Sequence, residues 1–211
     1  MGPLVKFCGI TNLTDALFAA ELNAWAVGFV FAKSPRKVPE DTVKRIVGKL
    51  PPYVSRVGVF VNEDVKNIER IAKSCKLDIA QLHGDESPEF CNEVKKFTKV
   101  IKAFRIKDED SLKTLKDYDV TLYLLDSYHL HLRGGGGKVF NWDLAVKAKA
   151  FGKDIILAGG LSPENIVRAV EKVKPYAVDI STGVEKSPGK KDKKLMKEII
   201  SKITGVDNVT E

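Results

Sequence analysis

The sequence predicts an α/β fold, a single (β/α)8 barrel, and two observations lead to this prediction. Short apolar runs rich in β-branched residues alternate strictly with amphipathic stretches of helical period, eight of each along 211 residues. Such alternation is typical of parallel strands joined by crossover helices. The runs are almost continuously apolar, which indicates strands buried on both faces. An open doubly wound sheet is the alternative, but it more often has fewer strands than the eight of a short barrel.

Each element follows from its residues. The helix expected at 40–50 places Val43, Ile46 and Val47 on one face. Ser87-Pro88 is typical of an N-cap and first turn, and begins the helix expected at 87–97. Asn12 stands where the first helix begins. Expected strands are 4–8, 26–31, 56–61, 78–82, 100–104, 121–125, 155–158 and 177–180; expected helices are 14–22, 40–50, 65–74, 87–97, 109–115, 142–150, 163–172 and 194–203. Because no linker interrupts this order, we expect one domain over 1–211.

Composition excludes several classes of protein. No apolar run is long enough to span a bilayer, and the N-terminus shows no secretory signal, so we expect no membrane association. Three cysteines without close-paired spacing indicate neither a disulfide framework nor a metal site, and favour the reducing cytoplasm. The net charge is +7, but lysines alternate with acidic residues along the chain. This pattern favours solvated helix faces over a nucleic-acid surface.

Polar residues gather where the expected strands end. In a (β/α)8 barrel the carboxyl ends of the strands meet at one face, and that face carries the chemistry. The residues found at these ends are Cys8, the run 33–37 with Arg36, Gln81 and His83, Arg105, Asp126, Gly159 and Gly160, Asp179, and Ser181, Thr182 and Gly183. The opposite ends carry bland residues. This asymmetry predicts a functional site at the carboxyl face.

Two consecutive loops indicate a phosphate site. "AGGLSPEN" and "DISTGVE" place Gly159, Gly160, Ser181, Thr182 and Gly183 directly after the last two strands. Backbone N–H groups in these loops of a barrel, with a short extra helix, frequently bind phosphate. The glycines could instead serve only to turn the chain. Two such loops in succession favour a small phosphorylated substrate.

A thiol and a carboxyl group face the same site. Cys8 and Asp126 end strands that lie across the barrel mouth, where they could act as a general base and a general acid. Cys8 would need a lowered pKa to act as the base; alternatively it is a small buried residue and Asp126 a loop cap. Arg36 could hold a carboxylate or be a solvated charge, and His83 could be a rim histidine. Glycines 134–137 could form a mobile lid or a plain surface loop.

Eight motifs in order give a family resemblance. "KFCGITN", "AVGFVFAKSPRKV", "VGVFVNE", "QLHGDE", "LLDS", "GGGGKVFNW", "LAGGLSPENI" and "AVDISTGVEKSPGKKD" resemble phosphoribosylanthranilate isomerase, from Lys6 to about Ile203. The resemblance implies a TIM barrel without a cofactor. It implies an Amadori rearrangement of N-(5-phosphoribosyl)anthranilate to 1-(2-carboxyphenylamino)-1-deoxyribulose 5-phosphate in tryptophan biosynthesis.

The resemblance also implies roles for single residues. Asp126 would be the general acid that protonates the ribose ring oxygen, and Cys8 the general base that removes the proton from sugar C2. Arg36 would hold the anthranilate carboxylate. The substrate-binding set is completed by His83, Asp179, Gly159, Gly160, Ser181, Thr182 and Gly183.

Some positions depart from the family pattern. Asn141 replaces the usual Asp before Trp142, Thr182 replaces a second serine, and 128–133, with His129 and His131, matches no motif. These differences concern lid behaviour and loop length, and none of them alters the proposed acid, Asp126, or the proposed base, Cys8.

Two other functions remain as alternatives. A related aminoribosyl-phosphate isomerase of histidine biosynthesis would need a carboxylate at the end of the first strand, where this chain has Cys8. A non-enzymatic barrel that binds an acidic partner would make Cys8 and Asp126 dispensable. The expected assembly is a monomer or a homodimer.

Overall fold

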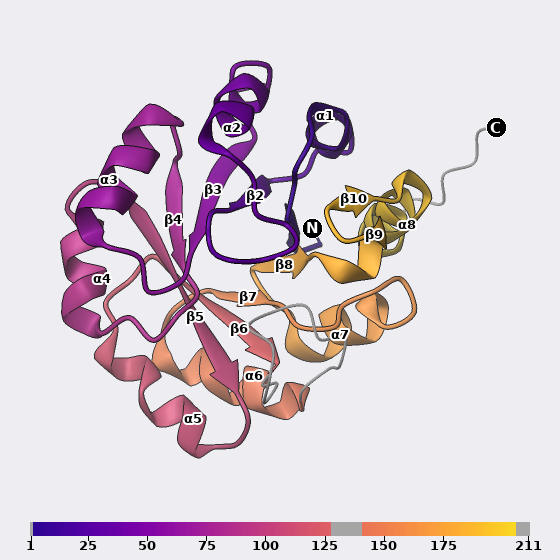
Figure 1. Cartoon of the computed structure of the whole chain (residues 1–211). Coiled ribbons are helices and arrows are strands. Elements are labelled where there is room, and N and C mark those ends of the chain that lie inside the picture. Colours follow the sequence, from indigo (N-terminus) through magenta and orange to yellow (C-terminus); the bar gives the residue numbers. More distant parts are fainter. Residues whose placement is uncertain (1, 128–140, 206–211) are drawn as a thin grey trace.

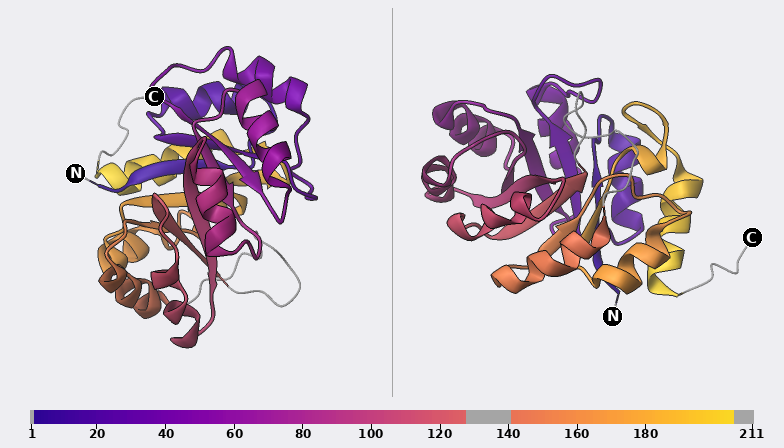
Figure 2. Two further views of the ribbon diagram at one scale, coloured as in Figure 1. Left: turned by 90° about the vertical axis from the view of Figure 1, so that its left-hand side faces the viewer. Right: turned by 90° about the horizontal axis from the view of Figure 1, so that it is seen from below.

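The computed structural model describes residues 2–127 and 141–205, and it confirms the closed barrel. Strands β1 to β8 pair in parallel in sequence order, and β8 pairs back to β1 (Figure 1). The helices form a ring outside the strands, which the turned views show from the side (Figure 2). The glycine run 134–137, which the sequence left as a mobile lid or a plain surface loop, and the histidines at 129 and 131 lie outside the described residues.

The observed elements follow the predicted order closely. The strands are β1 (Leu4–Cys8), β2 (Ala26–Val30), β3 (Ser55–Phe60), β4 (Ile79–Leu82), β5 (Lys99–Ile106), β6 (Leu122–Ser127), β7 (Ile155–Leu157) and β8 (Ala177–Ile180). The helices are α1 (Leu13–Glu21), α2 (Glu40–Val47), α3 (Val65–Ser74), α4 (Pro88–Lys95), α5 (Asp110–Lys113), α6 (Trp142–Ala148), α7 (Ile166–Val173) and α8 (Lys193–Thr204).

Local capping explains where several helices begin. The Asn12 side chain accepts a hydrogen bond from the Asp15 N–H at the start of α1. Ser87 does the same for Phe90 at the start of α4, with Pro88 in the first turn, as the sequence predicted. The Asp192 carboxylate caps α8.

The structure differs from the prediction at three places. Helix α5 is one short turn that continues into a 3-10 turn at Leu115–Asp117, rather than one helix over 109–115. Helix α7 begins at Ile166 and not at 163, since Asn165 first closes the preceding loop. A small antiparallel pair that was not predicted, β9 (Glu185–Ser187) and β10 (Lys190–Lys191), follows β8 and lies between α1 and α8 (Figure 1).

The apolar residues form two separate cores. The larger one fills the layer between the barrel and its helices. The smaller one fills the barrel interior toward the amino ends of the strands, and consists of Ala26, Val57, Ile79, Ile101, Ala103, Leu122, Leu124, Ile156, Ala158 and Ala177. Above it the interior becomes polar, with Lys6 and Gln81 fully buried. A packed lower barrel therefore supports a polar upper layer.

Three further features of the described residues concern membrane helices, metal clusters and cysteine pairing. None of the described helices is long and apolar enough to cross a membrane. Within residues 2–127 and 141–205, no group of three or more His, Cys, Asp or Glu side chains is arranged to hold a metal ion. All three cysteines are buried and unpaired.

Candidate active site

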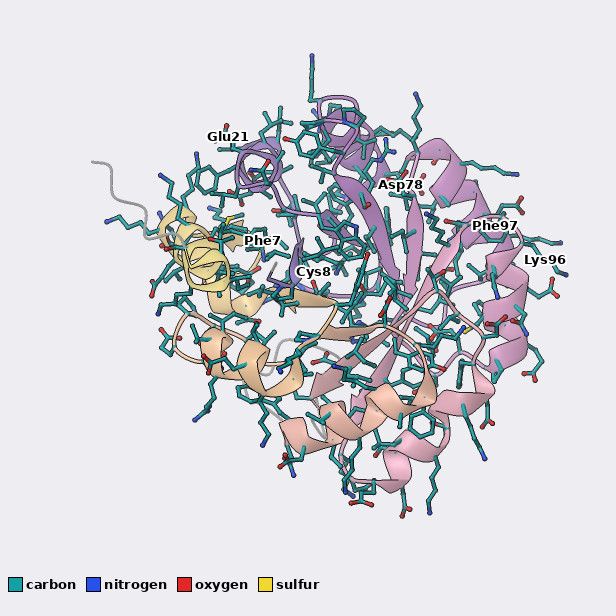
Figure 3. All side chains as sticks on the ribbon, turned by 180° about the vertical axis from the view of Figure 1, so that it is seen from behind. Phe7, Cys8, Glu21, Asp78, Lys96 and Phe97 are labelled. Carbon is teal, nitrogen blue, oxygen red and sulfur yellow. The ribbon has the colours of Figure 1, made fainter. Side chains whose placement is uncertain are left out.

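A cavity of about 570 Å³ opens at the carboxyl ends of the strands. All ten residues that the sequence assigned to the site line it: Cys8, Arg36, His83, Asp126, Gly159, Gly160, Asp179, Ser181, Thr182 and Gly183. The cavity thus brings together side chains from β1, β4, β6 and β8 with the loops after β2, β7 and β8. Figure 3 shows Cys8 near the middle of the barrel, whereas Lys96 lies on the outer ring.

Cys8 ends β1 beside a buried cation. Lys6, two residues earlier on the same strand, also points into the barrel, and its Nζ donates to Asp179 Oδ1 at 2.8 Å. The neighbouring strand makes room for both side chains with a glycine. A Cβ on Gly28 would lie 2.7 Å from Cys8 Sγ and 3.2 Å from Lys6 Nζ. The thiol and the ammonium therefore share one small space.

Burial and charge act on the thiol in opposite directions. Burial raises the pKa of Cys8, the positive charge of Lys6 lowers it, the negative charge of Asp179 raises it, and the net result lies above the ordinary value. Burial alone would lower the pKa of Lys6, but Asp179 raises it above its usual value, so Lys6 stays an ammonium group. Lys6 makes the larger charge contribution that lowers the pKa of the thiol, and the buried Lys191 adds a smaller one.

Asp179 thus has a structural partner as well as a place in the cavity. The sequence assigned it to substrate binding, and the structure pairs it with Lys6, with the Asp179 side chain 8% exposed. Lys6 itself was missed. The signal was present, because a lysine inside the apolar strand "LVKFC" has to be buried and therefore paired.

Asp126 ends a chain of three side chains. Gln81 Nε2 lies 2.9 Å from His83 Nδ1, and His83 Nε2 lies 3.2 Å from Asp126 Oδ2. The other oxygen, Asp126 Oδ1, accepts from the Ser127 N–H at 2.7 Å. His83, which the sequence left as either a rim residue or a site residue, is thus a direct partner of Asp126.

Gly159 is small because Asp126 lies against it. Its φ is +82°, a left-handed conformation that favours glycine. A Cβ there would lie 2.5 Å from the Ser127 nitrogen and 2.8 Å from Asp126 Oδ1. The first glycine of "AGGLSPEN" therefore gives the carboxyl group its space as well as turning the chain.

Arg36 is held by a buried carboxylate. Its Nε donates to Glu185 Oε1 at 2.9 Å, its Nη2 donates to Glu185 Oε2 at 2.7 Å, and Nη2 lies 3.3 Å from Thr182 Oγ1. Hydrogen bonding to Glu185 raises the pKa of Arg36 above its ordinary value. The sequence left Arg36 as either a carboxylate ligand or a solvated charge; the pairing with Glu185 shows a guanidinium held at the cavity wall, and binding of a substrate carboxylate stays a prediction.

Lys191 joins Glu185 to the ends of two strands. The Lys191 side chain is 0% exposed, and its Nζ contacts Glu185 Oε1 at 3.0 Å. The same nitrogen donates to the carbonyl oxygens of Cys8 at 2.5 Å and Ser181 at 3.1 Å. The sequence analysis missed both Lys191 and Glu185. Their burial depends on the β9–β10 pair, which gives no periodic signal.

The two glycine loops contact each other directly. A Cβ on Gly183 would overlap the Leu161 carbonyl oxygen and lie 3.0 Å from Ser162 Cα, so only glycine permits this approach. The Asn165 side chain donates to the Gly160 carbonyl at 2.8 Å and accepts from the Ser162 N–H at 3.0 Å, which fixes the first loop. The expected extra helix is a single 3-10 turn, Thr182–Val184.

Comparisons with known proteins give one consistent family. The family model described as N-(5'phosphoribosyl)anthranilate (PRA) isomerase matches residues 5–202. The N-(5'-phosphoribosyl)anthranilate isomerase of Geobacter sulfurreducens is 52% identical over 95% of this chain and 98% of its own length.

Two solved structures extend the similarity to the fold. A structure of monomers generated from the dimeric isomerase of Thermotoga maritima has a TM-score of 0.88 and 40% identity, covering 97% of this chain and 100% of its own. A structure of phosphoribosyl anthranilate isomerase in complex with reduced 1-(o-carboxyphenylamino)-1-deoxyribulose 5-phosphate has a TM-score of 0.88 and 41% identity, with the same coverage.

Proposed function

This chain belongs to the N-(5'-phosphoribosyl)anthranilate isomerase family, and we propose how its own side chains carry the isomerisation. The reaction, a step of tryptophan biosynthesis, converts N-(5-phosphoribosyl)anthranilate to 1-(2-carboxyphenylamino)-1-deoxyribulose 5-phosphate. The observation that carries the assignment of roles is one cavity lined by Cys8, Asp126 and both glycine loops. A thiol, a carboxyl group and an anion site together match an aminoaldose phosphate.

Asp126 is the general acid in this proposal. In its protonated form it gives its proton to the ribose ring oxygen as the bond from that oxygen to C1 breaks. The electron pair of the substrate nitrogen forms the C=N bond of a protonated Schiff base. The contact between Asp126 and His83 supports this role, because the imidazole can hold or return a proton at Asp126 Oδ2.

Cys8 is the general base. Its thiolate takes the proton from sugar C2, and the electrons of that C–H bond neutralise the iminium to give an enolamine, which tautomerises to the ketone. Burial raises the pKa of the thiol, and the nearby positive charges of Lys6 and, to a smaller extent, Lys191 favour the reactive thiolate. One turnover leaves Asp126 ionised and Cys8 protonated, and exchange with water restores both.

The remaining cavity residues position the two ends of the substrate. Arg36 would bind the anthranilate carboxylate with its guanidinium, which Glu185 holds at the cavity wall. The loops with Gly159, Gly160 and Gly183, together with the hydroxyls of Ser181 and Thr182, would bind the phosphate. His83 and Asp179 would contact the substrate between these ends.

Location and assembly are further parts of the proposal. Three unpaired, buried cysteines support a reducing cytoplasm. Small molecules are the expected ligands, and local pairing of surface lysines, such as Lys73 with Glu69, supports a solvated surface over a nucleic-acid one. The dimeric relative makes a homodimer the assembly to test first, against a monomer.

Fluorescence loss of N-(5-phosphoribosyl)anthranilate generated in situ tests the proposal. Cys8→Ser and Asp126→Asn should each reduce turnover by roughly 10²–10⁴-fold, the usual value of a positioned proton-transfer group. The melting temperatures of both variants should stay near that of the wild type, since serine is close in size to cysteine and asparagine to aspartate. Wild-type turnover in either variant would remove that residue from its role. If the protein converted only the aminoribosyl phosphate of histidine biosynthesis, and not N-(5-phosphoribosyl)anthranilate, the related isomerase would be the better assignment.

A further inference from the structure

Gln81 is a buried amide that the proposed roles leave without a task. It lies on β4, is 0% exposed, and lines the cavity. Its Nε2 is 2.9 Å from His83 Nδ1, and its Oε1 is buried without a hydrogen-bond partner among the residues that the structure describes. A buried acceptor left unpaired destabilises the folded state. This orphaned oxygen at a cavity wall therefore points to a ligand or to a second orientation of the amide.

The two amide orientations correspond to two proton counts on His83 and Asp126. With the NH2 group toward the ring, His83 Nδ1 is an acceptor, so Nε2 carries the hydrogen and donates to an ionised Asp126. With the oxygen toward the ring, Nδ1 carries a hydrogen. Nε2 then either accepts from a protonated Asp126 or, in the imidazolium, donates to its carboxylate. The second arrangement therefore holds one proton more on the pair than the first, and that proton is the one that can be given away.

We propose that Gln81 is a positioning residue that sets the tautomer of His83 and thereby holds the proton on the Asp126 pair for the acid step. Only a side chain with both a donor and an acceptor can bond the ring in both proton counts, and glutamine meets this requirement at one position. Gln81 lines the cavity, and in the substrate complex the amide atom turned away from His83 takes a hydrogen bond from, or gives one to, a sugar hydroxyl. The inference rests on the proposed function, in which Asp126 is the acid.

Other charges face the same cavity and have to be considered in any pH experiment. The titratable and charged residues that line it, besides His83 and Asp126, are Cys8, Lys33, Arg36, Lys37, Glu63 and Asp179. None of these is in the hydrogen-bonded chain from Gln81 to Asp126. A measurement on the His83 ring itself therefore distinguishes the effect of a Gln81 substitution from the titration of these six residues.

The direct test is ¹⁵N NMR of the His83 ring in protein labelled at histidine. The chain has only three histidines, and His83→Asn identifies the resonances of His83 by their loss. In the wild type, Nδ1 should be protonated at low pH, and the ring should change to the Nε2–H tautomer as the pair loses its proton. In Gln81→Glu the carboxylate accepts only, so Nδ1 should remain protonated to higher pH. In Gln81→Met the side chain can no longer select the tautomer of His83, so both tautomers should be seen.

Kinetics give the matched readout. Gln81→Met should lower kcat by roughly 10-fold or more, part of the range expected for a proton-transfer group. Gln81→Glu should retain more activity than Gln81→Met, and the alkaline fall of kcat/KM should move to higher pH. A role limited to packing predicts the reverse order or equal losses, since methionine is the better apolar replacement.

Two results would overturn the proposal. One is a wild-type His83 that keeps a single tautomer through the pH range in which activity falls. The other is that Gln81→Glu and Gln81→Met give the same ring state and the same pH profile. Failure of the proposed function is separate, because it would show as activity retained by Asp126→Asn, which the NMR of His83 does not measure.

Discussion

Replacing Lys191 with methionine should loosen the point at which three parts of the site meet. The Lys191 ammonium bonds the carbonyl oxygens of Cys8, which ends β1, and Ser181, which follows β8, and also the carboxylate of Glu185. Glu185 in turn holds Arg36. Methionine fills a similar volume but has no donor, so all three bonds are lost while the packing is largely kept.

The contacts of Lys191 give an estimate of the magnitude. Two carbonyl groups that lose a buried partner cost about 1–3 kcal/mol each. Glu185 keeps Arg36, so the cost of a fully unpaired buried charge does not apply, and losing the buried ammonium returns part of its desolvation cost. A net loss of about 3 kcal/mol in the free energy of unfolding is expected. For a chain of this size that corresponds to a fall of roughly 6–12 °C in Tm.

Thermal unfolding and steady-state kinetics on Lys190→Met provide the matched control. Lys190 precedes Lys191 on β10 and is exposed, so its replacement should change stability by no more than about 0.5 kcal/mol. At 25 °C, where both variants are folded, kcat/KM of Lys191→Met should fall by roughly 10–10²-fold, because Cys8 and the phosphate loop lose their shared support. A stability loss below about 1 kcal/mol, or activity equal to that of Lys190→Met, would refute this reasoning.

Three further outcomes are expected. Arg36→Met should raise KM for substrate while the affinity for ribulose 5-phosphate, which lacks the aromatic acid, stays within about 2-fold; equal losses for both ligands would indicate a structural role. Gly160→Val and Gly183→Val should weaken inhibition by inorganic phosphate far more than Lys33→Ala or Lys37→Ala, and a larger effect of the lysine changes would move the anion site. The rate of Cys8 alkylation should rise at higher pH in Lys6→Met, which loses the larger of the two positive charges that lower the thiol pKa. It should rise at lower pH in Asp179→Asn, which loses an anion that raises the thiol pKa; shifts in the same direction would contradict that electrostatic account.

The barrel was predictable because its strands carry their own signal. Runs such as "AVGFV" and "VIKAF" are buried on both faces and stay apolar almost throughout, so their positions and order could be read directly. Loop geometry limited the rest. The start of α7 depends on the side chain of Asn165 reaching back to Gly160, a contact between residues that no periodicity connects.

Site residues at the ends of strands were predicted from the sequence. The residues that hold them in place were missed where they come from outside the barrel strands. The fold brings Cys8, His83 and Asp126 into one cavity because each ends or follows a strand. Glu185 and Lys191 lie in the β9–β10 hairpin, whose two strands have only three and two residues. The sequence of this hairpin, "EKSPGKKD", has the composition of an exposed loop. Composition alone favours solvation there, and the contacts that reverse it are tertiary: Arg36 with Glu185, and Lys191 with the carbonyl oxygens of Cys8 and Ser181.

The glycines explain how so many polar groups can fit inside one barrel. Packed barrel interiors are normally filled by branched apolar side chains. Here Gly28 stands against Cys8 and Lys6, and Gly159 stands against Asp126, so each polar group occupies the space that a neighbour's side chain would take. The buried lysines beside the site are each paired, Lys6 with Asp179 and Lys191 with Glu185. Because unpaired charges are costly to bury, the small residues and the ion pairs depend on each other. A side chain added at either glycine should therefore disturb the chemistry of the site before it disturbs the fold.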